Sequence, residues 1–463
     1  MALNTDVLML IIEHLDIDDL LRLASTCRLF HLLVHNFGWS IFLRNNQRHS
    51  LTLQLSRSRW SPLAQVRYNH LADRAWSRAN FIARPLSDPW RGCLQPAIAL
   101  SIPTLLVAAG RVLYSCAVRD TSDVSPSRIV SDHSYSFNPG HGTIQPDITS
   151  IAFSLDTSQD RTVFLGFGDG SVEKVCLPPY HESHNRQHMD IERTPQTVLQ
   201  YHGPNVVQSI SCSSRILLSL SQWGLVFLTN LVSDSLSSTS VNLGTRSWTS
   251  HLCMSSSSPY ASQKNRPSAV YGIACAPPSS PLGPSEQIIV SGWYDGSIRI
   301  YDLRVSHHSQ HLPTLGSASS SSPPALLPVL TLRDPWSPEP IYAVSCGGGN
   351  ASFVAAGTAR HSVVAFWDVR QPSQGWSVHA PGNDSSPVYS VVLESSRLFG
   401  ATQSRPFVYD FGPGVTRDTY PPITPTGSNV AGRRRITEDR LRLERNGIGY
   451  HVAKYSHRGT GIF

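Results

Sequence analysis

The stretch Ile288–Arg304 reads IIVSGWYDGSIRIYDLR and predicts two antiparallel strands. A short β-branched run comes first, and Tyr294-Asp295-Gly296 then forms a turn, because Asp-Gly readily adopts the positive φ angles of tight hairpins. A second apolar run follows and ends at Tyr301-Asp302. Two strand-like runs around Asp-Gly are a strong hairpin signal. An isolated hairpin is only marginally stable in water, so this one requires neighbouring strands.

The rest of the chain supplies those strands as six copies of one three-strand module. Each copy opens with the pattern aliphatic, any, small, aliphatic, small, apolar. The six openings are Ala97–Ile102, Ile148–Phe153, Val207–Cys212, Val270–Cys275, Ile341–Cys346 and Val388–Leu393. The last three openings have a tyrosine at the second position: Tyr271, Tyr342 and Tyr389. Repetition every 45–70 residues or so points to the blades of a propeller.

The third strand of several modules ends in an aromatic-Asp pair. Trp367-Asp368 is a WD dipeptide, and Tyr301-Asp302 and Tyr409-Asp410 are its variants. Residues 96–411 therefore resemble WD repeats. The resemblance implies a mainly β fold, namely a β-propeller, and a structural role for these six side chains. A β-sandwich would not repeat one module six times. The family usually has seven blades, so we expect the region before Ala97 or the tail after Phe411 to complete a blade.

The N-terminal segment has a helical pattern instead. Asn4 or Thr5 can cap a first helix, Asp16 or Asp18 a second, and Ser25 or Thr26 a third. Three helices in so short a segment cannot bury all their apolar side chains among themselves, because domains below about 40 residues normally need a staple or a partner. The remaining apolar face is a candidate docking surface.

This segment resembles the F-box. Matching positions are Leu3, Val7, Leu8, Ile12, Leu15, Leu20, Leu23, Cys27, Phe30 and Trp39. The usual opening proline is replaced by Asn4, which can still begin a helix as its N-cap. The resemblance implies docking on a Skp-type adaptor and, through it, a cullin. We expect the adaptor-binding residues to be Leu3, Leu8, Ile12, Leu15, Leu20, Leu23, Cys27 and Phe30. The alternative is an ordinary N-terminal helical cap.

These patterns predict four parts: an F-box (1–43), a helical linker (44–90), a propeller (91–415) and a basic tail (416–463). In the linker, Ser61-Pro62 predicts the start of a helix that ends with Trp76. In the tail we expect a short helix with Leu441 and Leu443, a strand near 449–456, and a candidate nuclear signal at Arg433–Arg435. Segments near 178–194, 231–268 and 305–325 are expected to be surface loops, and the last two are Ser/Pro-rich.

Composition argues against several functions. The net charge is +6, and residues 431–463 alone carry +5, so no extended nucleic-acid-binding surface is implied. The eight cysteines form no CxxC pair, which disfavours zinc. We find no membrane span, signal peptide, nucleotide loop or catalytic motif, and expect no cofactor, no metal, no membrane association and no catalytic residues. The expected location is cytoplasmic, nuclear or both.

The two resemblances together imply the substrate-recognition subunit of an SCF (cullin-RING) ubiquitin ligase. Such a protein does no bond chemistry itself; it holds a protein substrate near the conjugating enzyme. The alternatives are a non-ligase scaffold and, less favoured, an enzyme that uses the central channel. The substrate site is not predictable from the sequence. Arginines that could read a phosphopeptide on the blade face are Arg161, Arg215, Arg299 and Arg405.

Overall fold

The structure of the chain is a computed structural model. It describes residues 5–90, 94–120, 126–138, 146–154, 162–178, 188–192, 198–202, 205–212, 216–221, 226–230, 253–254, 268–277, 279–282, 287–304, 325–382, 385–423 and 442–458. Leu3, Arg161, Arg215, Arg433–Arg435 and nearly all of the three predicted surface loops lie outside these residues.

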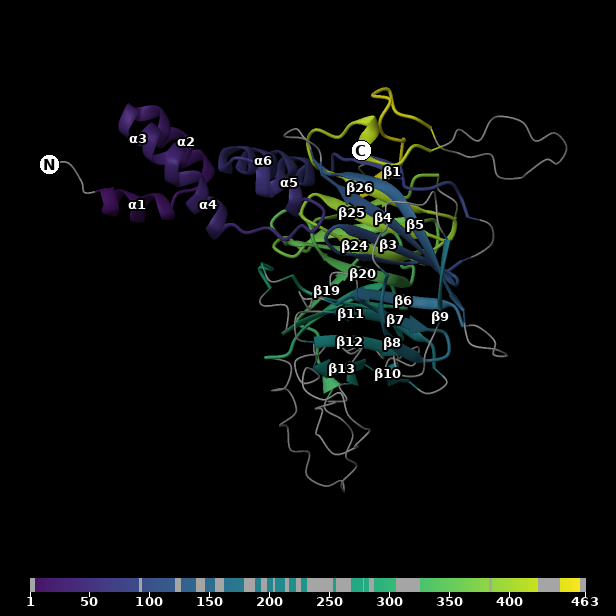
Figure 1. Cartoon of the computed structure of the whole chain (residues 1–463). Coiled ribbons are helices and arrows are strands. Elements are labelled where there is room, and N and C mark those ends of the chain that lie inside the picture. The colour runs from purple at the N-terminus through teal and green to yellow at the C-terminus, as the bar shows by residue number, and fades with distance from the viewer. Residues whose placement is uncertain are drawn as a thin grey trace, which may run out of the picture.

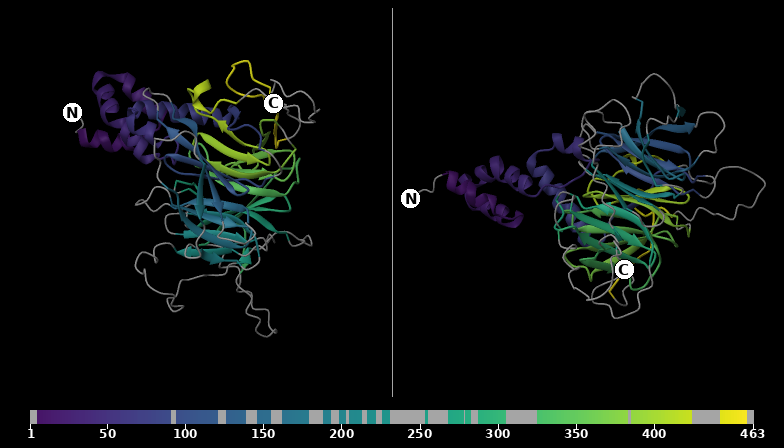
Figure 2. Two further views of the ribbon diagram at one scale, coloured as in Figure 1. Left: turned by 45° about the vertical axis from the view of Figure 1, so that its right-hand side comes forward. Right: turned by 90° about the horizontal axis from the view of Figure 1, so that it is seen from below.

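The helices form a separate arm beside a β domain (Figures 1 and 2). The distal part contains α1 (Thr5–Glu13), α2 (Ile17–Thr26), α3 (Arg28–Leu33), the π-helical turn η1 (Val34–Gly38) and α4 (Trp39–Asn45). Between it and the β domain lie α5 (Gln54–Arg59) and α6 (Pro62–Ser77). The start of α6 is as expected, because the Ser61 side chain accepts a hydrogen bond from the Ala64 N–H and Pro62 opens the helix.

Two of the three expected caps in the distal arm are settled by the structure. Asp16 caps α2 and accepts a hydrogen bond from the Asp19 N–H at 2.8 Å. The predicted cap of the third helix was wrong, because Cys27 is the N-cap of α3, with an extended backbone. Ser25 and Thr26 instead donate their hydroxyls to carbonyls of the preceding turn of α2. Such back-bonding competes with N-capping for the same hydroxyl.

The β domain is a propeller, and its inner strands match the six module openings. These strands are β2 (Ala97–Leu100), β6 (Ile148–Phe153), β11 (Val207–Cys212), β15 (Val270–Cys275), β20 (Ile341–Gly347) and β24 (Val388–Leu393). Each packs against the next in this order, and β24 returns to β2, where the Ile98 N–H donates to Ser390 Oγ at 2.9 Å. The ring is therefore closed.

The second and third runs of each module form the next strands outward. The second strands are β3 (Thr104–Ala109), β7 (Thr162–Phe167), β12 (Ile216–Ser221), β16 (Ile288–Trp293), β21 (Phe353–Thr358) and β25 (Arg397–Thr402). The third strands are β4 (Val112–Arg119), β8 (Ser171–Cys176), β13 (Val226–Asn230), β17 (Ser297–Asp302), β22 (Val363–Asp368) and β26 (Pro406–Asp410). All are antiparallel to their inner neighbours.

Outer strands complete most blades. They are β5 (Arg128–Asn138) with β9 (His188–Glu192), β10 (Val198–Tyr201), β19 (Leu330–Arg333), β23 (Gly375–His379), and two strands from outside the modules, β1 (Ile82–Pro85) and β27 (Lys454–Ser456). Five sheets have four or five strands and a sixth has three; β14 (Cys253–Met254) and β18 (Ala325–Leu326) form a separate pair. The described residues thus make six blade sheets, and the expectation of a seventh was wrong.

Both flanks of the repeat region contribute to the propeller. Strand β1 pairs with β26, with Ile82 opposite Asp410, and is the outermost strand of the last blade. Strand β27 pairs with β23 of the preceding blade. The first part of the expected tail helix, with Leu441, lies outside the described residues. From residue 442 on the chain is not helical, and Leu443 bridges Tyr450 across a turn with Gly447 at φ +67°.

The predicted Ile288–Arg304 hairpin is confirmed as two antiparallel strands. Strands β16 and β17 pair Ile288 with Asp302, and every residue of both is buried. Gly296 has φ +76°, and Asp295 accepts a hydrogen bond from the Ser297 N–H at 3.0 Å, which fixes the turn. The hairpin is therefore a central part of one blade.

Candidate functional site

The distal helices enclose a small apolar core of their own. Leu8, Ile12 and Leu20 are buried in it, together with Leu33, Val34, Trp39 and Val66. Val66 comes from α6, so the linker helix contributes directly to this core. The distal segment and the linker are therefore packed as one unit.

The same helices leave large apolar side chains in solvent. These are Val7, Leu10 and Ile11 of α1, Leu21 of α2, Leu29 and Leu32 of α3, and Phe37 of η1. Their exposed fractions run from 42% to 62%. Exposed apolar patches of this kind mark interaction surfaces more often than isolated surface leucines do.

The expected adaptor-binding residues are divided by this arrangement. Leu8, Ile12 and Leu20 belong to the internal core, and Leu15, Leu23 and Phe30 are partly buried against it. Cys27 is exposed at the break between α2 and α3. The exposed Leu10, Leu29, Leu32 and Phe37 are not among the expected residues. The i, i+3 spacing of Leu29 and Leu32 places both on one face of α3. The sequence does not say whether the core covers that face.

A single turn of the last blade receives the linker. Glu394, buried at the end of β24, accepts hydrogen bonds from the N–H groups of Leu51 and Thr52 at 2.5 and 3.0 Å and from the Thr52 hydroxyl. Ser395 Oγ accepts from Arg57 at 3.1 Å, and Ser396 pairs with the Tyr68 hydroxyl. Burial raises the pKa of Tyr68 to about 12, which keeps that hydroxyl neutral.

Trp76 anchors the end of α6 at the same turn. Its indole N–H donates to the Ser395 carbonyl at 2.8 Å, and its ring stacks on Phe411 with centroids 3.5 Å apart. Phe353 stacks on Trp76 at 4.7 Å. Trp76 is only 2% exposed. The linker helix is thus fixed to two adjacent blades by a buried aromatic cluster.

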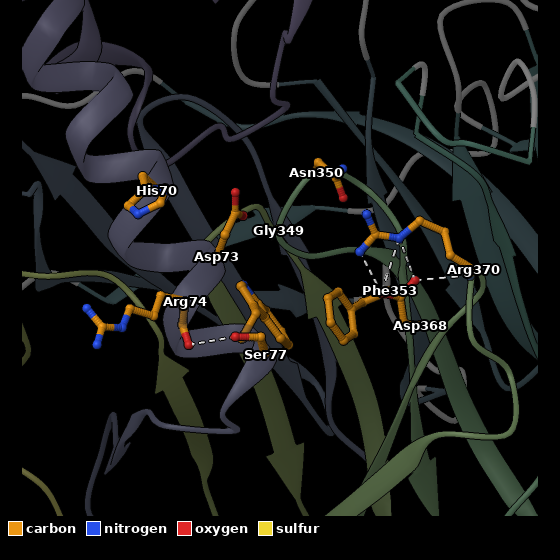
Figure 3. A pocket seen from close by; sticks show the side chains of 10 residues that line it. His70, Asp73, Arg74, Ser77, Gly349, Asn350, Phe353, Asp368 and Arg370 are labelled. Atoms are coloured by element: carbon orange, nitrogen blue, oxygen red, sulfur yellow. Dashed lines mark hydrogen bonds and ion pairs between the residues drawn. The ribbon is translucent and has the colours of Figure 1, made fainter. Parts of the chain in front are cut away.

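Beside this anchor, α6 and the edge of the adjacent blade enclose a cavity of about 500 Å³ (Figure 3). His70, Asp73 and Arg74 of α6 line one side, and Asn350 and Arg370 lie across from them. Two of its charges are paired in the wall: Asp73 with Arg48 at 2.5 Å and Asp368 with Arg370 at 2.6 Å. The cavity therefore lies where the linker helix α6 meets the propeller, and its paired charges belong to that junction.

The three aromatic-Asp pairs occupy equivalent places. Tyr301, Trp367 and Tyr409 are buried, and each following aspartate accepts a hydrogen bond from the backbone N–H two residues on, at 2.9 Å (Asp302), 3.0 Å (Asp368) and 2.7 Å (Asp410). The aspartates thus close the turn that leaves each third strand. A hydrogen bond from Arg304 also lowers the pKa of Asp302.

The two described candidate phosphate-reading arginines are not available. Arg299 is 6% exposed, pairs with Asp295 at 2.6 Å and lies over the Trp293 ring. Arg405 is buried as well. Neither can meet a phosphate without leaving its present position.

Other chemistry is limited within the described ranges. Six cysteines of these ranges form no disulfide: Cys27, Cys116, Cys176, Cys212, Cys275 and Cys346. Burial raises the pKa of Cys116 to about 12 and that of Cys275 to about 11. Those residues hold no group of three or more His, Cys, Asp or Glu side chains that could bind a metal. None of the described helices has the length and apolar character needed to cross a membrane.

Comparison with known protein families identifies the N-terminal helices. A family model of the F-box domain matches residues 2–39. No curated protein sequence matches the chain. One similar solved structure is titled "Crystal Structure of Mitotic Checkpoint Complex", with 14% identity and a TM-score of 0.38, covering 71% of this chain and 93% of that chain. The F-box match and the closed ring of blade sheets described above together make the chain an N-terminal helical F-box followed by a β-propeller.

Proposed function

We propose that this protein is the substrate-recognition subunit of an SCF-type ubiquitin ligase, with a propeller of WD-repeat type. F-box domains bind Skp1-type adaptors, and the F-box at residues 2–39 is the observation that carries the proposal. The propeller would bind a protein substrate, and a cullin would join through the adaptor. The division into F-box (1–43), linker (44–90), propeller (91–415) and tail (416–463) is part of this proposal, although β1 places residues 82–85 in a blade.

The exposed apolar side chains support adaptor docking. Leu10 on α1 and Leu29 and Leu32 on α3 are large and apolar, with exposed fractions of 62%, 59% and 48%. Each gains roughly 1.5–3 kcal/mol if fully buried in an interface, before the costs of association. The buried Leu8, Ile12 and Leu20 would act indirectly, by holding these helices together.

The rigid junction supports the receptor role. A substrate held by the propeller reaches the conjugating enzyme only if the F-box and propeller keep a fixed relative direction. The Glu394–Ser396 turn and Trp76 provide such a fixed connection through buried contacts. The chain itself would contribute proximity and no catalytic group.

Co-purification with a Skp-type adaptor and a cullin tests the proposal. We expect Leu29→Asp/Leu32→Asp to abolish adaptor retention while the propeller stays folded. The matched control is Leu63→Asp/Leu71→Asp, two leucines of the linker helix with exposed fractions of 38% and 36%. Retention of the adaptor by the α3 variant, or a stable assembly lacking adaptor and cullin, would favour the scaffold alternative.

A further inference from the structure

The linker helix α6 presents a row of basic side chains to solvent. Arg67, His70 and Arg74 lie in the helix and Arg78 is its C-cap, and all four are exposed. Successive members are three or four positions apart, so they follow one face of the helix. We call these four residues the basic stripe. Arg67 and Arg74 are two helical turns apart, and Arg78 extends the row by one further turn.

The basic stripe has no counter-charge of its own. Within the described residues, the side chains of Arg67, Arg74 and Arg78 form no ion pair and no hydrogen bond. Asp73 is the one acidic residue of α6, and Arg48 already pairs with it at 2.5 Å. The helix dipole favours cations in the last turn, which accounts for Arg74 and Arg78 but not for Arg67. The stripe is therefore open to acidic groups from another molecule.

Leucines accompany the arginines on this face. Leu63 and Leu71 stand four positions before and after Arg67, with exposed fractions of 38% and 36%. A nucleic acid would contact the arginines through its phosphates and would leave these leucines in water. A protein segment with acidic and apolar side chains can contact both kinds of residue. The composition of the face therefore favours a protein partner.

The stripe also borders the propeller. His70 and Arg74 line the cavity beside Trp76, and Arg370 of the adjacent blade lies across it (Figure 3). Arg370 pairs with Asp368 at 2.6 Å, yet its side chain is 51% exposed. The guanidinium of Arg74 is directed away from the cavity, apart from the paired charges in the cavity wall (Figure 3). A segment bound along the stripe can therefore reach the edge of a blade.

We propose that the basic stripe binds an acidic segment of the ubiquitination substrate, with Glu or Asp beside apolar residues. The guanidinium of arginine binds a carboxylate through two parallel hydrogen bonds. Exposed pairs of this kind are individually weak, so several must act together, as the repeated spacing allows. The charge match also raises the association rate and disfavours basic partners. The substrate is the favoured source because the stripe continues to the propeller edge, and in this respect the inference rests on the proposed function.

The test uses the full chain co-expressed with a Skp-type adaptor and three labelled peptides of equal length. All contain leucine and Gly-Ser spacers, and glutamate, glutamine or lysine fills the same remaining positions. Fluorescence polarisation should show the glutamate peptide binding about tenfold tighter than the glutamine peptide, with weaker binding at high salt. Arg67→Gln/Arg74→Gln should remove this preference, and Arg67→Lys/Arg74→Lys should retain most of it.

The matched control is Arg360→Gln/Arg458→Gln, which removes the same charge from two exposed arginines outside the stripe. It should keep the preference for the glutamate peptide. Equal binding of the glutamate and glutamine peptides, tighter binding of the lysine peptide, or an equal loss in both Gln variants would each overturn the inference.

Two further measurements on the same samples identify other occupants. Sedimentation with phosphatidylserine vesicles that Arg67→Gln/Arg74→Gln abolishes would make a membrane the occupant, and loss of the adaptor from that variant would make it the adaptor. Either result would overturn the inference. Absence of the adaptor from the wild-type sample would count against the proposed function, whereas its presence without selectivity for the glutamate peptide would count against this inference alone.

Discussion

The carboxylate of Glu394 accepts a hydrogen bond from the Thr52 backbone N–H at 3.0 Å, although 342 residues separate the two in sequence. This contact joins the segment that leaves the F-box to the last blade of the propeller. Because both groups are buried, neither has water as an alternative partner. The direction in which the arm leaves the propeller therefore depends on one turn.

Replacing Glu394 tests this dependence. We expect Glu394→Ala to leave the Leu51 and Thr52 N–H groups without their acceptor, at a cost of about 1–3 kcal/mol for each unsatisfied group. Limited proteolysis should then cut between α4 and α6 faster than in the wild type. Glu444→Ala, at a partly exposed glutamate outside this turn, is the control, and equal cleavage rates for both variants would contradict the assigned role.

Trp76 should be the most costly side chain of α6 to remove. Its 2%-exposed ring contacts Phe411 and Phe353, so Trp76→Ala is expected to destabilise the propeller–helix unit by about 3–5 kcal/mol. Trp336→Ala, at a tryptophan 58% exposed, should change the denaturation midpoint little. Urea denaturation of the two variants measures the difference, and comparable midpoints would show that Trp76 does not anchor the helix.

The ion pair between Arg397 and Asp410 has no exposed surface on either side chain. Nε of Arg397 lies 2.9 Å from Asp410, and Tyr420 donates its hydroxyl to the same carboxylate. Arg397→Leu should cost about 3–5 kcal/mol, because it leaves a buried carboxylate without its cation. Arg299→Leu should cost less, because its partner Asp295 is 31% exposed and keeps contact with water. A thermal-unfolding comparison in which the two variants lose equal stability would refute this ranking.

His202 should make stability depend on pH. Burial lowers its pKa from 6.5 to about 4, whereas the unfolded chain keeps the ordinary value. Between these values the unfolded state binds more protons, so stability is full above pH 6.5 and falls as the pH drops toward 4, by on the order of 3 kcal/mol. Unfolding midpoints measured across this range should fall less steeply in His202→Gln. Parallel curves for the two proteins would exclude His202 as the cause.

Gly375 should be essential for the attachment of β27. A Cβ at this position would overlap the His457 imidazole, whereas a Cβ at Gly168 would meet no atom closer than 3.8 Å. We expect Gly375→Ala to release the tail strand and to speed hydrogen exchange at residues 454–457, and Gly168→Ala to leave exchange there unchanged. Unaltered protection in Gly375→Ala would mean that the tail can shift without detaching.

Much of the propeller could be predicted because each blade repeats one local pattern. The six inner strands lie where the module openings are, and Asp295-Gly296 fixes the predicted hairpin turn. The helical arm was harder, because Leu8 to Ile12 is an unbroken apolar run in which period alone cannot separate core from surface. The structure buries Leu8 and Ile12 and exposes Leu10 and Ile11.

Contacts between distant segments were not predictable from local sequence. Strands β1 and β27 lie outside the repeat and are too short to show alternation, and their partners are set by tertiary packing. Nothing in the local sequence marks Glu394 as the acceptor for Leu51 and Thr52, and the three repeated tyrosines give no sign that their rings meet across blades. Even the blade count depended on which flanking segments joined existing sheets, so six modules did not imply a seventh.

The pairing of β1 with β26 also has a consequence for synthesis on the ribosome. Strand β1 is made before any inner strand, yet its partner β26 is the last strand of the repeat region to be made. Its edge stays unpaired while the intervening blades are translated, which exposes it to chaperones or to a wrong strand. The distal helices, whose core needs nothing beyond Val66, can fold and meet a binding partner long before the ring closes.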